Sequence, residues 1–248
     1  MRIARLTRWA AGAALVVLYT VQAGALAAGL QISPISITMP ADRKADEVWL
    51  RNSGTEVVHA QVRVYQWTQE GGEDVLVPDQ HMIASPPMVQ IAPGGQQLVR
   101  LVRTGPLLGP APDERSYRLL IDELPIQRTT AKAGLDFVFR YSVPVFVAGT
   151  APAKPVLEWT VHQSGQRVWL RVANTGTSHA QLANIEYTPP GGKTVMALNG
   201  LAGYALPGHY RDLPLNLPAS VFAQGGVFSS LTNAVKVETR VAPIVKTP

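Results

Sequence analysis

The 248-residue chain contains no cysteine, which excludes disulfide bonds, thiol catalysis and thiolate metal sites, so core burial must hold the fold together. Its 22 Lys and Arg residues against 17 Asp and Glu residues give a formal net charge of +5. Three of the basic residues lie within the first eight positions. Without them the balance is 19 against 17, which removes the main support for nucleic-acid binding.

The N-terminal segment is typical of a secretory signal peptide. Three arginines fall within residues 2–8, residues 9–26 carry no charge, and Ala25-Leu26-Ala27 matches a small-x-small cleavage site. The alternative is a transmembrane anchor, because about 18 apolar residues can span a bilayer. We expect residues 1–27 to be removed and the exported chain to begin near Ala28.

Short runs of alternating apolar and polar residues follow this segment. In the first run Leu30 and Ile32 share one parity, whereas Ile35 and Ile37 share the other. Pro34 stands at the change of phase. Because proline lacks an N–H group and is confined to the edges and breaks of sheets, we expect the strand to leave one sheet at Pro34 and to join another.

Later runs keep the same period of two, which places alternate residues on one face of a strand. They include residues 58–65, 159–161 and 168–172, and no long stretch of the exported chain shows a helical period. Turn dipeptides such as Gly71-Gly72 and Asn199-Gly200 separate the runs. Many short strands at this spacing predict an all-β protein built of β-sandwiches.

A short internal echo indicates two similar domains. Residues 50–61 and 170–181 both contain Leu-Arg, then Asn-x-Gly-Thr, then His-Ala-Gln. Both copies predict a strand, a tight turn and a second strand. Because residues 149–155 have the composition of a linker, we expect a first domain over residues 28–148 and a second over residues 149–248.

The segment from Arg115 to Thr150 is the most informative part of the chain. Residues 116–124 predict one strand, and residues 135–147 predict a longer one that contains Pro144. Two interpretations of the longer strand remain open: a core strand, or an exposed edge whose side chains a partner takes up by strand addition. Pro144 favours the edge, because proline is confined to edges and bulges. A row of large apolar side chains lies on one face of this strand: Leu135, Phe137, Phe139, Tyr141 and Val143.

Candidate chemistry is sparse, and we expect neither enzymatic activity nor a cofactor. None of the five histidines has a partner at metal-ligand spacing, and the nearest approach to a copper site is His81 with Met82 and Met88. Asp122 and Glu123 are adjacent, so they point to opposite faces of a strand and cannot share one proton. The sequence contains no nucleophile elbow and no plausible catalytic triad.

Three segments resemble a known protein family. Residues 83–101, Ile-Ala-Ser-Pro-Pro-Met-Val-Gln-Ile-Ala-Pro-Gly-Gly-Gln-Gln-Leu-Val-Arg-Leu, resemble the first-domain signature of PapD-like periplasmic pilus chaperones. Residues 116–125 and 140–146 resemble the archaic branch of the chaperone–usher family. The resemblance implies two immunoglobulin-like β-sandwich domains arranged as a boomerang. It also implies a periplasmic protein that binds, folds and delivers pilus subunits to an outer-membrane usher.

The resemblance also implies a mechanism, donor-strand complementation, in which the chaperone supplies the strand that an incomplete pilus subunit lacks. It assigns the donor role to Leu135, Phe137, Phe139, Tyr141 and Val143. The expected partners are pilus subunits and the usher, without nucleic acid, and the exposed strand could also join two copies of the chain. Two rival functions are kept: a structural pilus subunit or secreted adhesin, and a periplasmic metal-binding protein.

One departure from the best-studied branch concerns the C-terminal carboxylate of the subunit. That branch holds the carboxylate with an arginine from the first strand and a lysine from the last strand of the first domain. The corresponding positions here fall near Ser36 and Pro144, and neither residue can supply a cation. A carboxylate that leaves water is costly without a paired cation, so either another residue supplies the anchor or the anchor is weak.

Arginine suits this anchoring task because its planar guanidinium binds both carboxylate oxygens. Pairing Leu124 with Leu135 sets a register that predicts Arg118 opposite Tyr141, near the cleft between the domains. The alternative is that the basic residues of these strands are simply solvated. The candidates, in the order we expect, are Arg118, Arg140 and Arg100.

Overall fold

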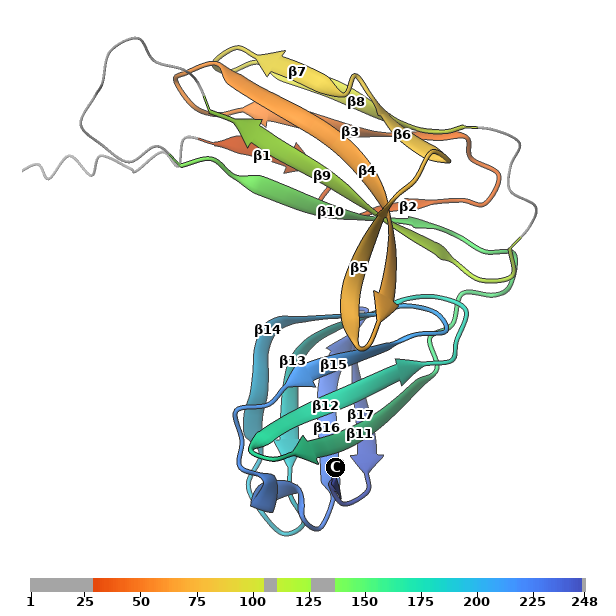
Figure 1. The fold of residues 1–248 in the computed structure, drawn as a ribbon, viewed down its shortest axis with the longest axis vertical. Coiled ribbons are helices and arrows are strands. Elements are labelled where there is room, and N and C mark those ends of the chain that lie inside the picture. Colours follow the sequence, from red (N-terminus) through yellow and green to blue (C-terminus); the bar gives the residue numbers. More distant parts are fainter. Residues whose placement is uncertain (1–28, 105–110, 126–136, 247–248) are drawn as a thin grey trace, which may run out of the picture.

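The computed structural model describes residues 29–104, 111–125 and 137–246, which form two β-sandwiches set at an angle to each other (Figure 1). The expected signal peptide lies outside these residues. Within them no helix is long and apolar enough to cross a membrane. The helix found in this part of the chain is the four-residue 3-10 helix η1 (Ala219–Phe222), so the prediction of an all-β fold is confirmed.

The first sandwich consists of two sheets, ordered β1-β3-β8-β6 and β2-β10-β9-β4-β5, with β7 paired to β4. Alternate residues of both sheets point inward, and the core includes the fully buried side chains of Leu50, Leu101 and Ile121. The strands are β1 (Leu30–Ser33), β2 (Ile37–Met39), β3 (Ala45–Asn52), β4 (Val58–Glu70), β5 (Glu73–Pro78), β6 (Met82–Ser85), β7 (Met88–Ile91), β8 (Gln96–Arg103), β9 (Arg115–Leu124) and β10 (Arg140–Val147).

The predicted change of sheet at Pro34 is confirmed. β1 pairs antiparallel with β3 in one sheet, whereas β2 pairs parallel with β10 in the other. The Ser33–Pro34 peptide bond at the break is cis. The N-terminal segment therefore contributes to both sheets and closes one side of the sandwich.

The second sandwich consists of the sheets β15-β12-β11-β18 and β14-β13-β16-β17. An aromatic cluster fills its centre, where the Tyr187 ring lies 4.6 Å from Phe222 and 4.8 Å from Phe228 between centroids. The strands are β11 (Leu157–Ser164), β12 (Arg167–Asn174), β13 (Ala180–Thr188), β14 (Val195–Ala205), β15 (Tyr210–Pro214), β16 (Gly226–Thr232), β17 (Val235–Val241) and β18 (Val245–Lys246).

The internal echo corresponds to equivalent turns in the two sandwiches. Asn52 is fully buried, its side-chain nitrogen donates to the carbonyl oxygens of Glu56 and Ile91, and its side-chain oxygen accepts from the Gly54 N–H. Asn174 is buried in the same way: it donates to two backbone carbonyls and accepts from the N–H of the glycine two residues on. A buried asparagine that satisfies three backbone groups explains why both copies need it at this place.

The junction between the sandwiches is a packed aromatic contact. β4 and β5 form a hairpin that reaches from the first sandwich to the second (Figure 1). Trp67 of β4 and Phe146 of β10 meet Tyr204 and Leu206, and all four are at most 7% exposed. Trp67 and Tyr204 pack edge to face with ring centroids 5.2 Å apart, a favoured aromatic geometry.

Polar contacts reinforce the junction. The His179 ring lies parallel to Phe146 with centroids 3.5 Å apart, and its Nδ1 is 2.8 Å from Oε1 of Glu114. At the tip of the hairpin the carbonyl of Gly72 accepts from the Asp212 N–H at 3.0 Å. Gly72 has a φ of 83°, and a Cβ at this position would lie 2.6 Å from Cγ of Asp212, so only glycine fits.

Gln69 provides the most deeply buried of these polar contacts. Its side-chain nitrogen donates to the Tyr204 carbonyl at 2.7 Å, and its side-chain oxygen accepts from the Leu206 N–H at 3.0 Å. The residue is only 3% exposed. The two sandwiches are therefore joined by backbone groups of one and a side chain of the other.

We predict that Gln69→Leu lowers the free energy of unfolding by about 1–3 kcal/mol, because it leaves a buried N–H and a buried carbonyl without partners. Urea denaturation measures this loss. Gln66→Leu is the matched control, because Gln66 lies on the same strand but is exposed, and it should change stability by less than about 0.5 kcal/mol. Equal effects of the two substitutions would contradict the assigned role of Gln69.

Candidate functional site

Strand β10 has an open edge over most of its length. β9 pairs with all of β10 on one side, but on the other side β2 pairs only with residues 145–147. The Glu123 N–H donates to the Phe139 carbonyl at 2.9 Å, so backbone groups of odd-numbered residues face β9. The backbone groups of Arg140, Ser142 and Pro144 therefore face the open edge. Because proline has no N–H group, Pro144 itself adds no unpaired donor to this edge.

The apolar row on β10 and the segment before it divides into two parts. Val143 is 4% exposed and belongs to the core of the first sandwich, whereas Phe137 and Phe139 are 72% and 48% exposed. The aromatic rings follow one another, with Phe137 and Phe139 stacked at a centroid distance of 6.4 Å and Phe139 and Tyr141 tilted at 6.3 Å. Leu135 lies outside the described residues. One end of the row therefore lies in the core of the first sandwich, whereas the other end is exposed.

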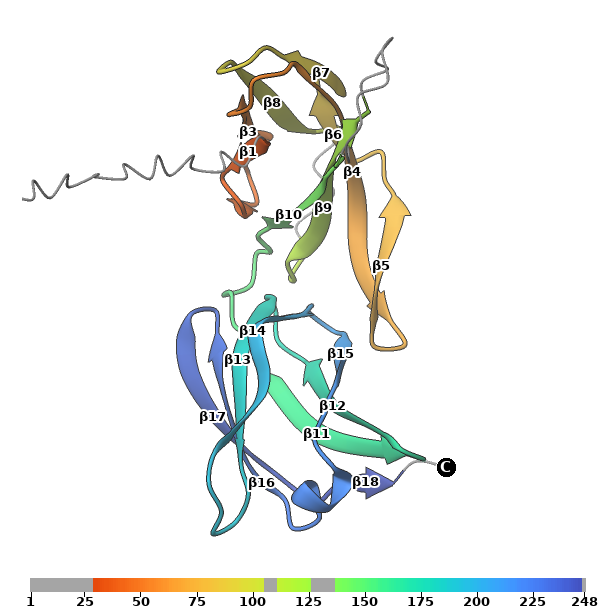
Figure 2. The same cartoon turned by 90° about the vertical axis from the view of Figure 1, so that its left-hand side faces the viewer.

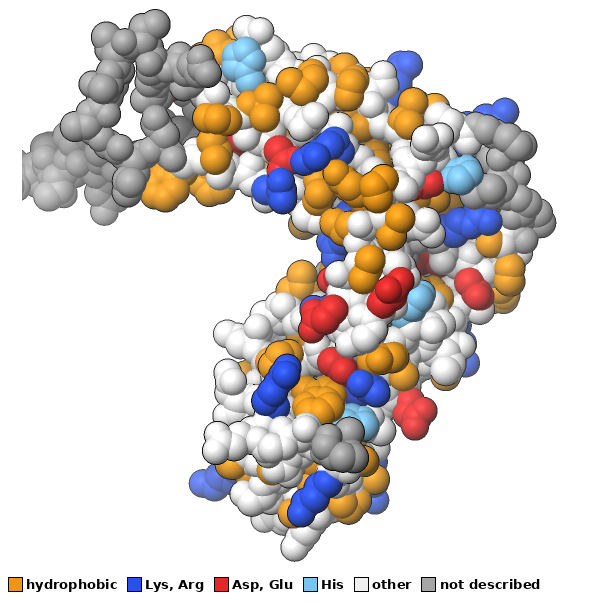
Figure 3. Space-filling view, viewed as in Figure 1, with side chains coloured by type: hydrophobic (Ala, Val, Ile, Leu, Met, Phe, Trp, Pro, Cys, Tyr) orange, Lys and Arg blue, Asp and Glu red, His pale blue; other side chains and the backbone are white. Residues whose placement is uncertain are grey.

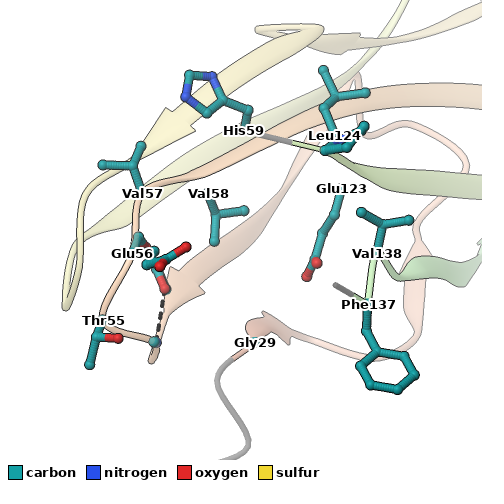
Figure 4. A pocket seen from close by; sticks show the side chains of 13 residues that line it. Gly29, Thr55, Glu56, Val57, Val58, His59, Glu123, Leu124, Phe137 and Val138 are labelled. Carbon is teal, nitrogen blue, oxygen red and sulfur yellow. Dashed lines mark hydrogen bonds between the residues drawn. The ribbon is translucent and has the colours of Figure 1, made fainter. Parts of the chain in front are cut away.

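Tyr141 lies where the two parts of the row meet. Its hydroxyl donates to Oε1 of Glu123 at 3.1 Å. Burial, followed by the charge and hydrogen bond of Glu123, raises the pKa of Tyr141 to about 12. Glu123 also lines a pocket of about 340 Å³ together with Phe137 and Val138, and Figure 4 shows its side chain reaching toward the chain near Gly29.

The predicted register of the hairpin is wrong. Arg118 pairs with Pro144, and Tyr141 pairs with Ile121, a shift of three residues from the predicted pairing. The predicted register would have placed the Arg118 side chain on the same face as that of Tyr141, which is the face toward the core. The side chains that these two strands contribute to the core of the first sandwich all occupy odd positions, so odd residues must pair with odd residues to share the core face.

Arg118 therefore lies on the outward face, at the junction between the sandwiches. Its guanidinium carbon is 3.6 Å from the centroid of the Trp67 ring and 5.2 Å from that of Tyr204, both cation–π distances. Burial lowers the pKa of Arg118, yet an arginine stays charged at neutral pH. Among the described residues no carboxylate forms an ion pair with this partly buried cation.

The other two anchor candidates are placed differently. Arg140 and Arg63 both bind the carboxylate of Asp122, the latter at 2.6 Å. Burial opposes the charge of Asp122, but the two hydrogen bonds outweigh it and keep the pKa of Asp122 below its usual value. Arg100 lies on β8 in the other sheet, opposite Glu47 and Ser85. The structure therefore does not bring Arg118 and Arg100 together.

The opposite orientation predicted for Asp122 and Glu123 is confirmed. Asp122 binds two arginines on the outward face, whereas Glu123 binds Tyr141 of the apolar row. In Figure 3, which views the outward face of the β4–β9 region, basic and acidic side chains adjoin among apolar ones. This face presents a mixed surface rather than one of a single charge.

The three residues of the copper-site alternative, His81, Met82 and Met88, do not come together in the structure. His81 is 2.6 Å from Asp79, but Met82 is 1% exposed and part of the core, whereas Met88 lies on a different strand and is 52% exposed. Within the described ranges no group of three His, Asp or Glu residues could hold a metal ion. His81 lies in an exposed bend before β6, whereas the Met82 thioether is buried in the core, so the two do not form one set of ligands.

Sequence reasoning missed the junction residues, including Trp67, Gln69 and Tyr204. One local signal was available for Trp67. Trp67 lies on the outward face of β4, whose other residues include Arg63, Tyr65 and Gln69. A tryptophan at such a position indicates that another element packs over it.

Comparison with known proteins gives consistent results. Residues 29–152 match the model of the family "Pili and flagellar-assembly chaperone, PapD N-terminal domain". The uncharacterized fimbrial chaperone YcbF of Escherichia coli K12 is 26% identical over 188 residues, which cover 70% of this chain and 78% of YcbF.

Solved structures give the same result. A chain of the CsuC–CsuE chaperone–tip adhesion subunit complex, from the archaic chaperone-usher Csu pili of Acinetobacter baumannii, is 28% identical with a TM-score of 0.67. The match covers 89% of this chain and all of that one. A chain of the Salmonella enterica SafA pilin–SafB chaperone complex shares the fold with a TM-score of 0.60 at 16% identity, over 86% of this chain and 96% of that one.

We predict that Glu123→Gln lowers the pKa of Tyr141 from about 12 toward the ordinary value, because the substitution removes the neighbouring negative charge. A tyrosine whose folded-state pKa is raised stabilises the fold below pH of about 10, and this contribution is lost as the pH rises toward about 12. The variant should show a smaller loss over that window. Ultraviolet titration against Tyr141→Phe isolates the signal. An unchanged Tyr141 titration in Glu123→Gln, as in the control Glu47→Gln, would contradict the prediction.

Proposed function

Because this chain belongs to the family of pili and flagellar-assembly chaperones, we propose that it binds and folds pilus subunits in the periplasm and delivers them to an outer-membrane usher. The observation that carries the proposal is the open edge of β10 beside the exposed aromatic rings of Phe137 and Phe139. In this proposal residues 1–27 are the export signal, residues 28–148 the subunit-binding domain and residues 149–248 the second domain.

The binding mechanism that we propose is donor-strand complementation. A subunit that lacks one strand exposes apolar surface and unpaired backbone groups, and the open edge of β10 supplies matching hydrogen-bonding groups. Phe137, Phe139 and Tyr141 enter the subunit, with Leu135 extending the row. Each large side chain buried in this way contributes about 1.5–3 kcal/mol before the cost of association. Val143 already lies in the chaperone's own core, so it fixes the strand rather than filling the subunit.

The same edge explains a competing interaction. Without a subunit, the exposed backbone and rings of β10 offer a surface for a second copy of the chain. Self-association and subunit binding would then exclude each other, because both use the same edge.

We further propose that Arg118 anchors the C-terminal carboxylate of the subunit. Its cross-strand partner is Pro144, and the resemblance puts the anchoring lysine of the best-studied branch near that residue. The two side chains share the outward face, with directly opposed residues about 5 Å apart, so Arg118 presents its charge close to the place that Pro144 leaves without one. Arg140 already binds Asp122, which makes it the weaker candidate, and we assign no anchoring role to Arg100.

We predict that Phe139→Asp abolishes capture of a co-expressed pilus subunit and leaves the chaperone folded, because a 48%-exposed ring contributes little to its own fold. Co-purification from the periplasm and thermal unfolding measure the two effects. Val77→Asp is the matched control, at a 42%-exposed residue on the opposite edge of the same sheet. Unfolding of the Phe139 variant without any partner, or unchanged capture, would refute the donor role.

We predict that Arg118→Ala weakens subunit binding at least about tenfold, because the carboxylate loses its paired cation on leaving water. The loss should largely disappear with a subunit whose C-terminus is amidated. Arg100→Ala should bind normally. Titration calorimetry of both variants with both forms of the subunit provides the measurement. Equal losses with and without the free carboxylate would show that Arg118 acts in another way.

A further inference from the structure

The outward face of the β14-β13-β16-β17 sheet carries an apolar row that no described part of the chain covers. Ala183 of β13 pairs with Leu201 of β14 on one side and with Leu231 of β16 on the other. Leu201 is 60% exposed, Leu231 is 37% exposed, and Met196, on the same face of β14, is 48% exposed. We name Met196, Leu201 and Leu231 the second-domain patch.

A β-bulge holds Leu201 in this outward position. Asn184 has a φ of 48°, and its side-chain oxygen accepts a hydrogen bond from the Gly200 N–H at 2.8 Å. The register between β13 and β14 shifts on both sides of this point, so Leu182 and Ile185 both face the core although they are three residues apart. Bulges re-aim side chains and are frequent next to functional sites. The exposure of Leu201 is thus built into the sheet.

The second-domain patch lies on the same face of its sheet as Tyr204, which packs against the proposed anchor Arg118. The Gln181 side-chain nitrogen donates to the Tyr204 hydroxyl at 2.9 Å, and the Tyr204 ring lies 5.2 Å from the guanidinium carbon of Arg118. Tyr204 and Leu201 both belong to β14. Figures 1 and 2 show β13 and β14 on the side of the second sandwich that lies toward β10 across the bend.

We propose that the second-domain patch contacts the pilus subunit held by β10, so that the second domain takes a direct part in subunit binding. This inference rests on the proposed function. Single exposed leucines are common on protein surfaces, whereas Leu201, Ala183 and Leu231 form one apolar row across β14, β13 and β16, and such contiguous patches mark interaction sites. Glu186 lies beside Met196, and Lys236 beside Leu231, which gives the patch the polar rim of a protein interface.

The first test measures how tightly chaperone variants bind the subunit that co-purifies with the wild-type chaperone. Leu201→Gln combined with Leu231→Gln should weaken binding roughly tenfold, because two partly exposed leucines lose burial in the complex. Val245→Gln is the matched control: Val245 is 46% exposed but lies on the other sheet of the same sandwich, and its variant should bind normally. Unchanged affinity of the double variant would overturn the inference. If Phe139→Asp still abolishes binding in that case, the proposed function stands without it.

Thiol protection tests the contact without relying on the stability of the double variant. Because the chain has no cysteine, Leu201→Cys introduces a single thiol whose rate of maleimide alkylation reports its exposure. Addition of the subunit should slow alkylation at least about tenfold at this position and leave the rate of Val245→Cys unchanged. Equal rates at position 201 with and without the subunit would refute the contact. Protection that appears only with the usher, or only at raised chaperone concentration, would assign the patch to that partner and overturn the inference.

Discussion

Strand β10 is paired on both sides over only part of its length, and the rest of the structure depends on how its residues are divided between the paired part and the open part. Its C-terminal half is held by β9 and β2 and sends Val143 and Val145 into the core. Its N-terminal half keeps β9 on one side only, and the preceding Phe137 and Phe139 remain exposed. A strand anchored at one end can therefore present unpaired backbone and aromatic rings at the other without unfolding its own sandwich.

The junction between the sandwiches supports this arrangement from the far end of the same strand. Phe146 of β10 packs among Trp67, Tyr204 and His179, so the strand that offers the open edge also joins the two domains. Buried hydrogen bonds such as those of Gln69 make this contact specific, because each broken bond leaves a buried polar group without a partner. The angle between the sandwiches thus has a physical cause, and both domains border the inner side of the bend (Figure 1).

Arg118 lies at this junction, where we propose that it anchors the subunit. Two aromatic rings partly remove the guanidinium from water, and among the described residues no carboxylate compensates its charge. A cation in such surroundings attracts an anion more strongly than it would in water, and a planar guanidinium favours a carboxylate in particular because it can bind both oxygens. If Arg118 is the anchor, as we propose, the cation lies on β9 and not on β10, where the best-studied branch of the family carries its lysine.

The sequence by itself determined the features that depend on local periodicity and on single residues with restricted geometry. These are the all-β fold, the change of sheet at Pro34, the repeated asparagine turn and the apolar row of β10. The tertiary structure alone decided the register of β9 and β10, the face on which Arg118 lies, the aromatic junction and the patch around Leu201. The physical reason is that a period of two survives any shift of register, whereas pairing partners and covered faces depend on contacts between residues far apart in the chain.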